Sequence, residues 1–134
     1  MTEFRKVTES FSVSPQISAA DVASAAAEGF TLIVNNRPDG EDAGQPTAGE
    51  IEAAAHRAHL VFVSIPVVGQ PTREQVMAVQ AAIAGADGGK VLAYCRSGTR
   101  SITTWAIGEA ARGGDRADIV ARGAAAGYDL SWLA

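Results

Sequence analysis

The sequence is poor in several features, and each shortage excludes a class of structure. Cys95 is the single cysteine among 134 residues, which excludes an internal disulfide and a multi-cysteine metal site. A lone thiol is typical of a reducing compartment. No apolar run approaches the ~20 residues of a membrane helix, because Ser64 and Pro66 interrupt the longest one. Residues 1–7 lack the apolar core of a signal peptide. We therefore expect a cytoplasmic protein.

Positive charge is scarce as well. Eleven basic and fifteen acidic residues give a net charge of −4, whereas proteins that bind nucleic acids or anionic membranes usually present a basic surface. The sequence thus predicts no nucleic-acid partner and no membrane partner. Its length fits one domain, residues 1–134, and its apolar fraction of 47% is enough for an ordinary core.

Short β-type runs alternate with longer alanine-rich runs along the chain. Residues 4–13 predict one or two edge strands, and further strands are predicted at 30–34, 60–65 and 90–94. Capping residues and glycines predict helices at 19–28, 48–59, 73–84, 101–111 and 116–126. This alternation predicts an α/β fold, a three-layer sandwich with a mainly parallel central sheet. Such sheets place their sites at the carboxyl ends of the strands, where the loops 35–46 and 95–100 begin.

The loop that begins at Cys95 is the most informative part of the sequence. It leads from a buried strand into a helix N-terminus, where free N–H groups and the helix dipole favour an anion, first of all a thiolate. Arg96 and Arg100 add positive charge, and Gly98 allows a tight turn with inward-pointing N–H groups. A buried structural cysteine is the alternative, but these neighbours favour a reactive nucleophile. Besides Cys95 and Arg100, the predicted anion-binding residues are Arg96, Ser97, Gly98, Thr99 and Ser101.

The loop 35–46 supplies further candidates. Arg37 either helps to bind the substrate anion or forms a loop-stabilising pair with a carboxylate. Asp39, in the same loop, is a further candidate to support the site. Glu41 and Asp42 are interpreted as solvated loop charges.

Other polar and aromatic residues carry less information. His56 and His59 lie three residues apart, and the chain has no other histidine or second cysteine to complete a metal site. We expect neither a metal nor a cofactor. Trp132 and Tyr128 predict a packed C-terminal turn, with a partner surface as the alternative.

The phrase Tyr94-Cys-Arg-Ser-Gly-Thr-Arg-Ser101 resembles the active-site loops of two families. Protein tyrosine phosphatases have five residues between the cysteine and an arginine, followed by serine or threonine; rhodanese sulfurtransferases have a shorter loop. Four residues separate Cys95 from Arg100, which is the rhodanese length. Tyr94 also stands where phosphatases usually have histidine.

Several spaced motifs resemble a third, bacterial family. They are Ile33-Val-Asn-Asn-Arg-Pro-Asp-Gly-Glu41, Gly44-Gln-Pro46, Ile65-Pro-Val67 and Pro71-Thr72. The resemblance covers about residues 5–112 and is to the beta-lactamase hydrolase-like, phosphatase-like domain family, which is also labelled sulfur transferase. It implies a dual-specificity-phosphatase-like fold that carries a rhodanese-like loop. The family name also suggests a metallohydrolase or a sulfide-oxidising enzyme as a partner.

The position of the general acid bears on the reaction. Dual-specificity phosphatases carry an aspartate upstream of the cysteine that protonates the leaving alkoxide, but the matching residues 66–70 contain no carboxylate. Without that acid, expulsion of a poor leaving group slows by ~10²–10⁴-fold. Asp39, Glu41 or Asp42 would have to reach in from the other loop. Sulfur transfer needs no such acid, because sulfite and thiolates leave readily.

The leading hypothesis is therefore a sulfur transferase that forms a Cys95 persulfide. Its substrate is a small anionic sulfane-sulfur donor that Arg100 binds, and Ser101 is expected to hydrogen-bond Cys95. Because the chain has no second cysteine, the acceptor is an external thiol. The first alternative is a phosphatase that forms a phosphocysteine from a phosphomonoester. The second is an inactive module that binds oxyanions or a phosphorylated partner.

Overall fold

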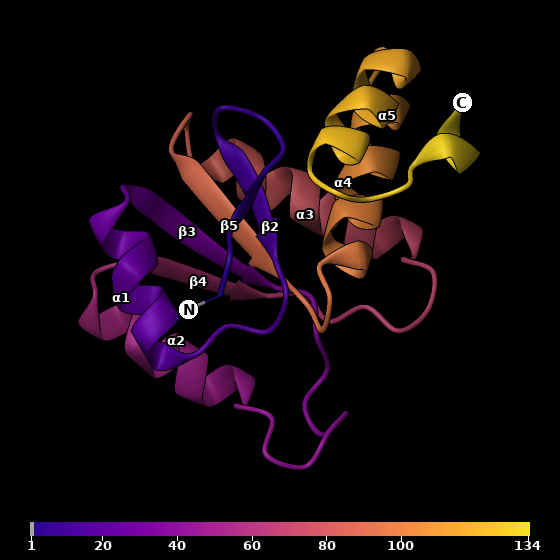
Figure 1. Cartoon of the computed structure of the whole chain (residues 1–134). Coiled ribbons are helices and arrows are strands. Elements are labelled where there is room, and N and C mark those ends of the chain that lie inside the picture. Colours follow the sequence, from indigo (N-terminus) through magenta and orange to yellow (C-terminus); the bar gives the residue numbers. More distant parts are fainter. Residues whose placement is uncertain (1) are drawn as a thin grey trace.

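A central sheet with helices on both faces makes up the structure, a computed structural model that describes residues 2–134 (Figure 1). In chain order the elements are β1 (Arg5–Lys6), β2 (Phe11–Ser14), α1 (Ala19–Ala27), β3 (Phe30–Asn35), α2 (Ala48–Arg57), β4 (Val61–Ser64), α3 (Arg73–Gly85), β5 (Lys90–Tyr94), α4 (Thr99–Ala111), α5 (Arg116–Ala125) and the 3₁₀ turn Ser131–Leu133. None of the helices in residues 2–134 has the length and apolar character that crossing a membrane requires.

The sheet has the strand order β1-β2-β5-β3-β4. Only β1 is antiparallel to its neighbour, and the other pairings are parallel, which confirms the predicted mainly parallel sheet. Ser14 and Asn35 both pair with Tyr94, and Ser64 pairs with Asn35. The four parallel strands therefore end at the same level, and the loops that follow them begin side by side.

Two apolar clusters hold the helices against the sheet. Ile17, Val22 and Ile51 belong to the cluster under α1 and α2. Val79 and Trp105 belong to the cluster under α3, α4 and α5. Figure 1 shows these two groups of helices on opposite sides of the sheet. The three-layer α/β architecture expected from the sequence is thus confirmed.

The N-terminal segment forms two strands, of which one is the predicted edge strand. That strand is β1; β2 lies between β1 and β5, and all four of its residues are buried. Its serines at 12 and 14 are small and buried, and Ser14 Oγ donates a hydrogen bond to the Pro15 carbonyl at 2.8 Å. A short polar side chain is tolerated inside a sheet when its hydroxyl finds an acceptor nearby.

Helix α4 begins differently from the other four α-helices. The side chains of Ser18, Thr47, Thr72 and Asp115 cap α1, α2, α3 and α5, as a helix start normally requires. The residue before α4 is Gly98, in the left-handed region with φ +92° and without a side-chain cap. The helix starts two residues before the predicted Ser101, which brings its first turn up to the Cys95 loop.

Candidate active site

Four loops meet at the carboxyl edge of the sheet, and backbone hydrogen bonds join them. The Gln16 N–H donates to the Arg96 carbonyl at 3.3 Å, and the Asn36 N–H donates to the Tyr94 carbonyl at 2.8 Å. The Val67 N–H donates in turn to the Asn36 carbonyl at 3.0 Å. The loops after β2, β3, β4 and β5 are therefore connected at this edge, where the sequence placed the site.

Cys95 lies at the bottom of this arrangement. Its side chain is fully buried, with an exposed fraction of 0%, and its Sγ accepts a hydrogen bond from the Gly98 N–H at 3.1 Å. The first helical bond of α4 runs from Ile102 to Gly98, so the amides of Arg100 and Ser101 have no acceptor within the helix. Backbone donors at a helix start favour a thiolate and a bound anion.

Arg100 connects this loop to two of the others. Its Nη1–H groups donate to the Val67 carbonyl and to Glu41 Oε2, both at 2.8 Å. Its Nη2–H donates to Glu41 Oε1 at 2.7 Å. Glu41 foremost, with the Cys95 sulfur contributing, raises the pKa of the Arg100 guanidinium. These contacts use three of the five guanidinium N–H groups, and the other two remain for the Cys95 sulfur or a bound anion.

Arg37 stabilises the loop that carries Glu41. Its side chain is only 3% exposed, and it donates from Nε to Glu41 Oε1 at 2.9 Å and from Nη2 to Asp42 Oδ2 at 2.8 Å. Its Nη1–H donates to Gln16 Oε1 at 3.1 Å. Of the two roles left open for Arg37, the structure supports the loop-stabilising pair. The expected neighbour Asp39 is not its partner, because Asp39 Oδ1 accepts from the Ala48 N–H at 2.8 Å at the start of α2.

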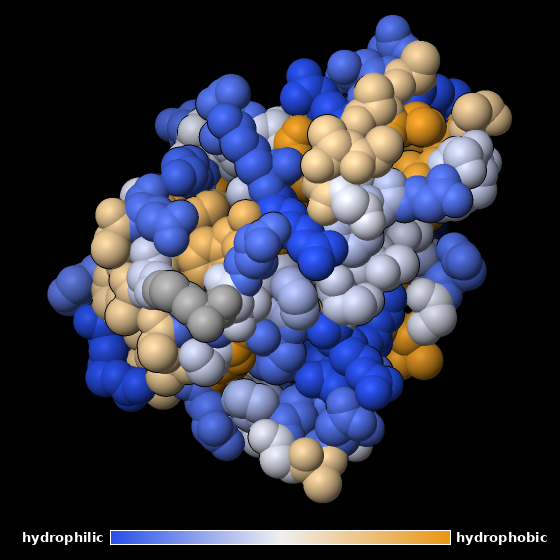
Figure 2. All heavy atoms as spheres, in the orientation of Figure 1, coloured by the Kyte–Doolittle hydropathy of each residue, from blue (hydrophilic) through white to orange (hydrophobic). Residues whose placement is uncertain are grey.

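Glu41 and Asp42 are exposed, as expected of loop charges, but both form ion pairs that the sequence did not predict. Glu41 accepts hydrogen bonds from two guanidinium groups, and that of Arg100, with help from Arg37, lowers the pKa of the carboxyl from 4.5 to about 2. Asp42 pairs with Arg37 and lies 3.5 Å from Arg96 Nε. Figure 2 shows strongly hydrophilic side chains where these loops meet. The sequence did not reveal these pairs because Glu41 and Arg100 are 59 residues apart.

Among residues 2–134, no side chain of the other predicted anion-binding residues forms a hydrogen bond to the sulfur. Arg96 is 66% exposed and faces Asp42, while Ser97 Oγ–H donates to Thr99 Oγ1 at 3.0 Å. Ser101 Oγ is buried without a hydrogen-bond partner among residues 2–134, so the expected bond to Cys95 is not formed. The backbone of this loop, rather than its hydroxyl groups, therefore contacts the sulfur.

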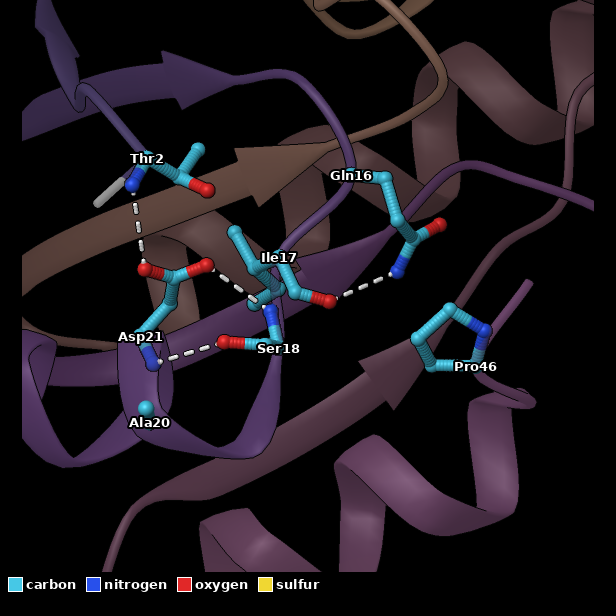
Figure 3. Close-up of a pocket in the computed structure, with 7 residues that line it drawn as sticks. All are labelled: Thr2, Gln16, Ile17, Ser18, Ala20, Asp21 and Pro46. Carbon is cyan, nitrogen blue, oxygen red and sulfur yellow. Dashed lines mark hydrogen bonds between the residues drawn. The ribbon is translucent and has the colours of Figure 1, made fainter. Parts of the chain in front are cut away.

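A hollow of about 710 Å³ lies beside the site. It is lined by Gln16, by the start of α1 and by Pro46, and Figure 3 shows the Asp21 carboxylate there accepting from the backbone of Thr2 and Ser18. Gln16 faces this hollow and also accepts a hydrogen bond from Arg37.

Among residues 2–134, no group of three or more histidine, cysteine or acidic side chains is placed to hold a metal ion.

Sequence reasoning missed one further residue at this site. Tyr128, expected in a packed C-terminal turn, donates from its hydroxyl to the Ser97 carbonyl at 2.8 Å. Its position 31 residues after Ser97 gives no local signal of this contact. Trp132, in the same segment, is 52% exposed.

The sequence model of the family described as "Beta-lactamase hydrolase-like protein, phosphatase-like domain" matches residues 3–112. The chain belongs to this phosphatase-like domain family. A beta-lactamase hydrolase-like protein of Agrobacterium fabrum is 39% identical over 127 residues, which cover 93% of the chain. The chain spans only 29–31% of the length of the curated relatives that it matches.

Solved structures place the phosphatase-like domain within the protein tyrosine phosphatase-like fold. A Neisseria meningitidis protein, described as a candidate phosphatase, has a TM-score of 0.82 at 32% identity and covers 96% of this chain and 91% of its own. Kinase-associated phosphatase has a TM-score of 0.72 at 10% identity, with 91% and 80% covered, and that likeness shows the fold alone. The predicted family and the predicted dual-specificity-phosphatase-like fold are both confirmed.

Proposed function

We propose that this phosphatase-like domain is a sulfur transferase in which Cys95 accepts a sulfane sulfur from a small anionic donor. The proposal combines a buried thiol at the start of α4, one backbone N–H on its sulfur, and the Arg100 guanidinium beside it. These groups bind an oxyanion in either a transferase or a phosphatase. The partners that the nearby carboxylates already have favour the transferase, because a phosphatase needs one of them as a proton donor.

Each carboxylate on the loop after β3 already has a hydrogen-bond or ion-pair partner in the structure. Glu41 pairs with two arginines, Asp42 pairs with Arg37, and Asp39 accepts from the start of α2. Glu41, with its pKa of about 2, is ionised near neutral pH and cannot supply a proton. The loop after β4 reaches Arg100 through the backbone carbonyl of Val67, and residues 65–72 contain no acid. This lack of a proton donor is the observation that carries the proposal.

The first step needs no proton. The Cys95 thiolate attacks the terminal sulfur of a thiosulfate-like donor, a new sulfur–sulfur bond forms, and the donor's own sulfur–sulfur bond breaks. Sulfite leaves with the bonding electron pair as a stable anion, and Cys95 becomes a persulfide. The N–H donors of Arg100 that Glu41 and Val67 leave unused, together with the first amides of α4, would bind the sulfonate oxygens.

The second step regenerates the thiol. An external thiolate attacks the outer sulfur of the persulfide, takes that sulfur as its own persulfide, and releases the Cys95 thiolate. An external acceptor is required because the chain has no second cysteine. A metallohydrolase or sulfide-oxidising partner would supply or consume these persulfides.

Intact-protein mass spectrometry tests the proposal. Wild-type protein incubated with thiosulfate should gain the mass of one sulfur atom and release an equal amount of sulfite, and cyanide should remove the added sulfur. Cys95→Ser should gain none. Arg100→Met should gain sulfur more slowly, while Arg112→Met, at an exposed arginine just after the end of α4, should match wild type. A wild-type protein that gains no sulfur contradicts the proposal.

Phosphomonoester hydrolysis is the second candidate, because the fold and the family are phosphatase-like. In that reaction Cys95 forms a phosphocysteine and water releases phosphate. Without a general acid, turnover would be confined to aryl phosphates with good leaving groups. Cys95-dependent release of phosphate from alkyl as well as aryl phosphates, with no sulfur gained, would favour this candidate. Absence of both reactions, with sulfate still bound, would indicate an inactive oxyanion-binding module.

A further inference from the structure

Tyr128 touches the candidate site from the C-terminal segment, beyond the residues 3–112 that the family match covers. Its hydroxyl donates to the Ser97 carbonyl at 2.8 Å. Figure 1 shows this segment running from α5 back along α4. Ser97 is the residue before Gly98, whose N–H donates to Cys95 Sγ at 3.1 Å. The two hydrogen bonds thus belong to one peptide unit.

A single planar peptide links the tyrosine to the sulfur. Residues 2–134 contain no cis peptide bond, and in a trans peptide the C=O and the N–H point in opposite directions. When Tyr128 holds the Ser97 carbonyl on one side, the Gly98 N–H must point to the other side, where Cys95 Sγ lies. A donor on the carbonyl also polarises the peptide and makes its N–H a stronger donor.

Because residue 98 is a glycine, the orientation of the Ser97–Gly98 peptide needs a hydrogen bond from outside the loop to fix it. Gly98 has φ +92°, and glycine adopts positive and negative φ with similar ease. Without an external partner, this peptide can rotate so that its carbonyl, instead of its N–H, faces the sulfur. A carbonyl oxygen would repel a thiolate or a bound oxyanion. The orientation of the Ser97–Gly98 peptide therefore determines whether the loop attracts an anion.

We propose that Tyr128 is a positioning residue that fixes the Ser97–Gly98 peptide with its N–H on Cys95. The role deepens the proposed function, since it stabilises the thiolate on which that function rests. Tyr128 acts through the peptide and does not need to touch the substrate.

The structure holds Tyr128 itself in place. Helix α5 ends in a Schellman motif, in which the Gly127 N–H donates to the Ala124 carbonyl at 3.0 Å and the Tyr128 N–H donates to the Gly123 carbonyl at 2.8 Å. The Arg5 guanidinium lies over the tyrosine ring, 5.2 Å from its centroid. A Cβ at Gly98 would collide with the tyrosine hydroxyl, so a glycine there is also what makes room for the contact.

The hydroxyl keeps its proton where a donor is needed. Burial raises the pKa of Tyr128 above its ordinary value, with the nearby Cys95 sulfur adding to the rise against the opposing effect of Arg5. Charged groups near the thiol are Arg100, its partner Glu41 and the adjacent Arg96, and Arg5 lies against Tyr128. Tyr128→Phe keeps all four of these residues.

A thiolate titration of Tyr128→Phe tests the proposal without any sulfur donor. The ultraviolet absorbance of the thiolate is followed against pH in wild type and in Y128F, and the same curve for Cys95→Ser in each background is subtracted to remove tyrosine absorbance. In Y128F the Gly98 N–H is no longer held towards the Cys95 thiolate. The midpoint of the thiolate titration should therefore move up by about one pH unit. Trp132→Phe, in the same segment, should leave the midpoint unchanged.

An unchanged midpoint in folded Y128F would overturn the proposal, since a merely structural tyrosine would change thermal stability and not the titration. Tyr128→Met, which also lacks the hydroxyl, replaces Y128F if that variant does not fold. The outcome is separable from sulfur transfer. A shifted midpoint in a protein that gains no sulfur refutes the proposed function alone, whereas sulfur transfer with an unchanged midpoint refutes the role of Tyr128 alone.

Discussion

Glu41→Gln removes the carboxylate charge that pairs with Arg37 and Arg100. Glu41 accepts two hydrogen bonds from Arg100 and one from Arg37, and Arg100 foremost lowers its pKa from 4.5 to about 2. A difference of that size corresponds to about 3 kcal/mol of stabilisation for a shielded group. The Glu41 side chain is 26% exposed, so solvent screening reduces the contribution to about 1–2 kcal/mol.

The lowered pKa of Glu41 determines how the loss of stability in Glu41→Gln depends on pH. Because the folded pKa lies below the unfolded one, the stabilisation is present in full above pH 4.5 and disappears as the pH falls towards 2. Urea unfolding at several pH values should show Glu41→Gln less stable than wild type by about 1–2 kcal/mol near neutral pH. The difference should shrink steadily as the solution is acidified through that window.

The control for this experiment is Glu52→Gln, at an exposed carboxylate of α2 that forms no ion pair among residues 2–134. It should change stability little at any pH. A Glu41→Gln variant that matches wild type near neutral pH would refute the reasoning. A loss of stability that stays constant down to the acid limit would refute it as well, because the effect would then not arise from the charge.

Four further predictions concern Arg100, Gly98, the start of α1 and the Cys95 thiol. Arg100→Lys loses the two-pronged geometry of guanidinium and should weaken sulfate binding by about tenfold in calorimetric titration. Gly98→Ala should cost at least about 1–2 kcal/mol of stability because of its positive φ, and adding Tyr128→Phe should recover part of that loss by removing the collision with the hydroxyl. Ser18→Ala removes the cap of α1 and should cost about 1 kcal/mol in urea unfolding. Cys95, fully buried, should react faster with iodoacetamide than with a bulky aromatic disulfide.

Each of these predictions has a result that would contradict it. Sulfate binding that Arg100→Lys leaves intact would show that the guanidinium does not bind the anion. Strictly additive effects at residues 98 and 128 would show that their contact carries no energy. A wild-type stability for Ser18→Ala would mean that the capping box of α1 is unimportant. Equal rates with both thiol reagents would place Cys95 at the surface.

Local features of the chain predicted much of the fold. The run before Cys95 forms β5, and Gly98 adopts the positive φ that the tight loop requires. Capping residues such as Thr47 and Thr72 mark helix starts because their side chains satisfy the first amides. These signals lie within a few residues of the structures they determine, so a single sequence reveals them.

Contacts between distant residues escaped prediction. Glu41 meets Arg100 across 59 residues, and Tyr128 meets Ser97 across 31. Nothing in the neighbourhood of Glu41 distinguishes it from an ordinary loop charge until β3 and β5 are paired and their loops lie side by side. The interior position of β2 escaped prediction for the same reason, because β2 pairs with β5, a strand far along the chain.

A competition experiment tests the central claim most directly. Wild-type protein is incubated in one sample with equal amounts of thiosulfate and an aryl phosphate, the reaction is quenched, and the mass of the intact protein is measured by mass spectrometry. Cys95→Ser is treated in the same way. The account predicts the mass of one added sulfur on wild type and no adduct on the variant. A phosphate adduct on wild type with no added sulfur would contradict it and assign Cys95 to phosphoryl transfer.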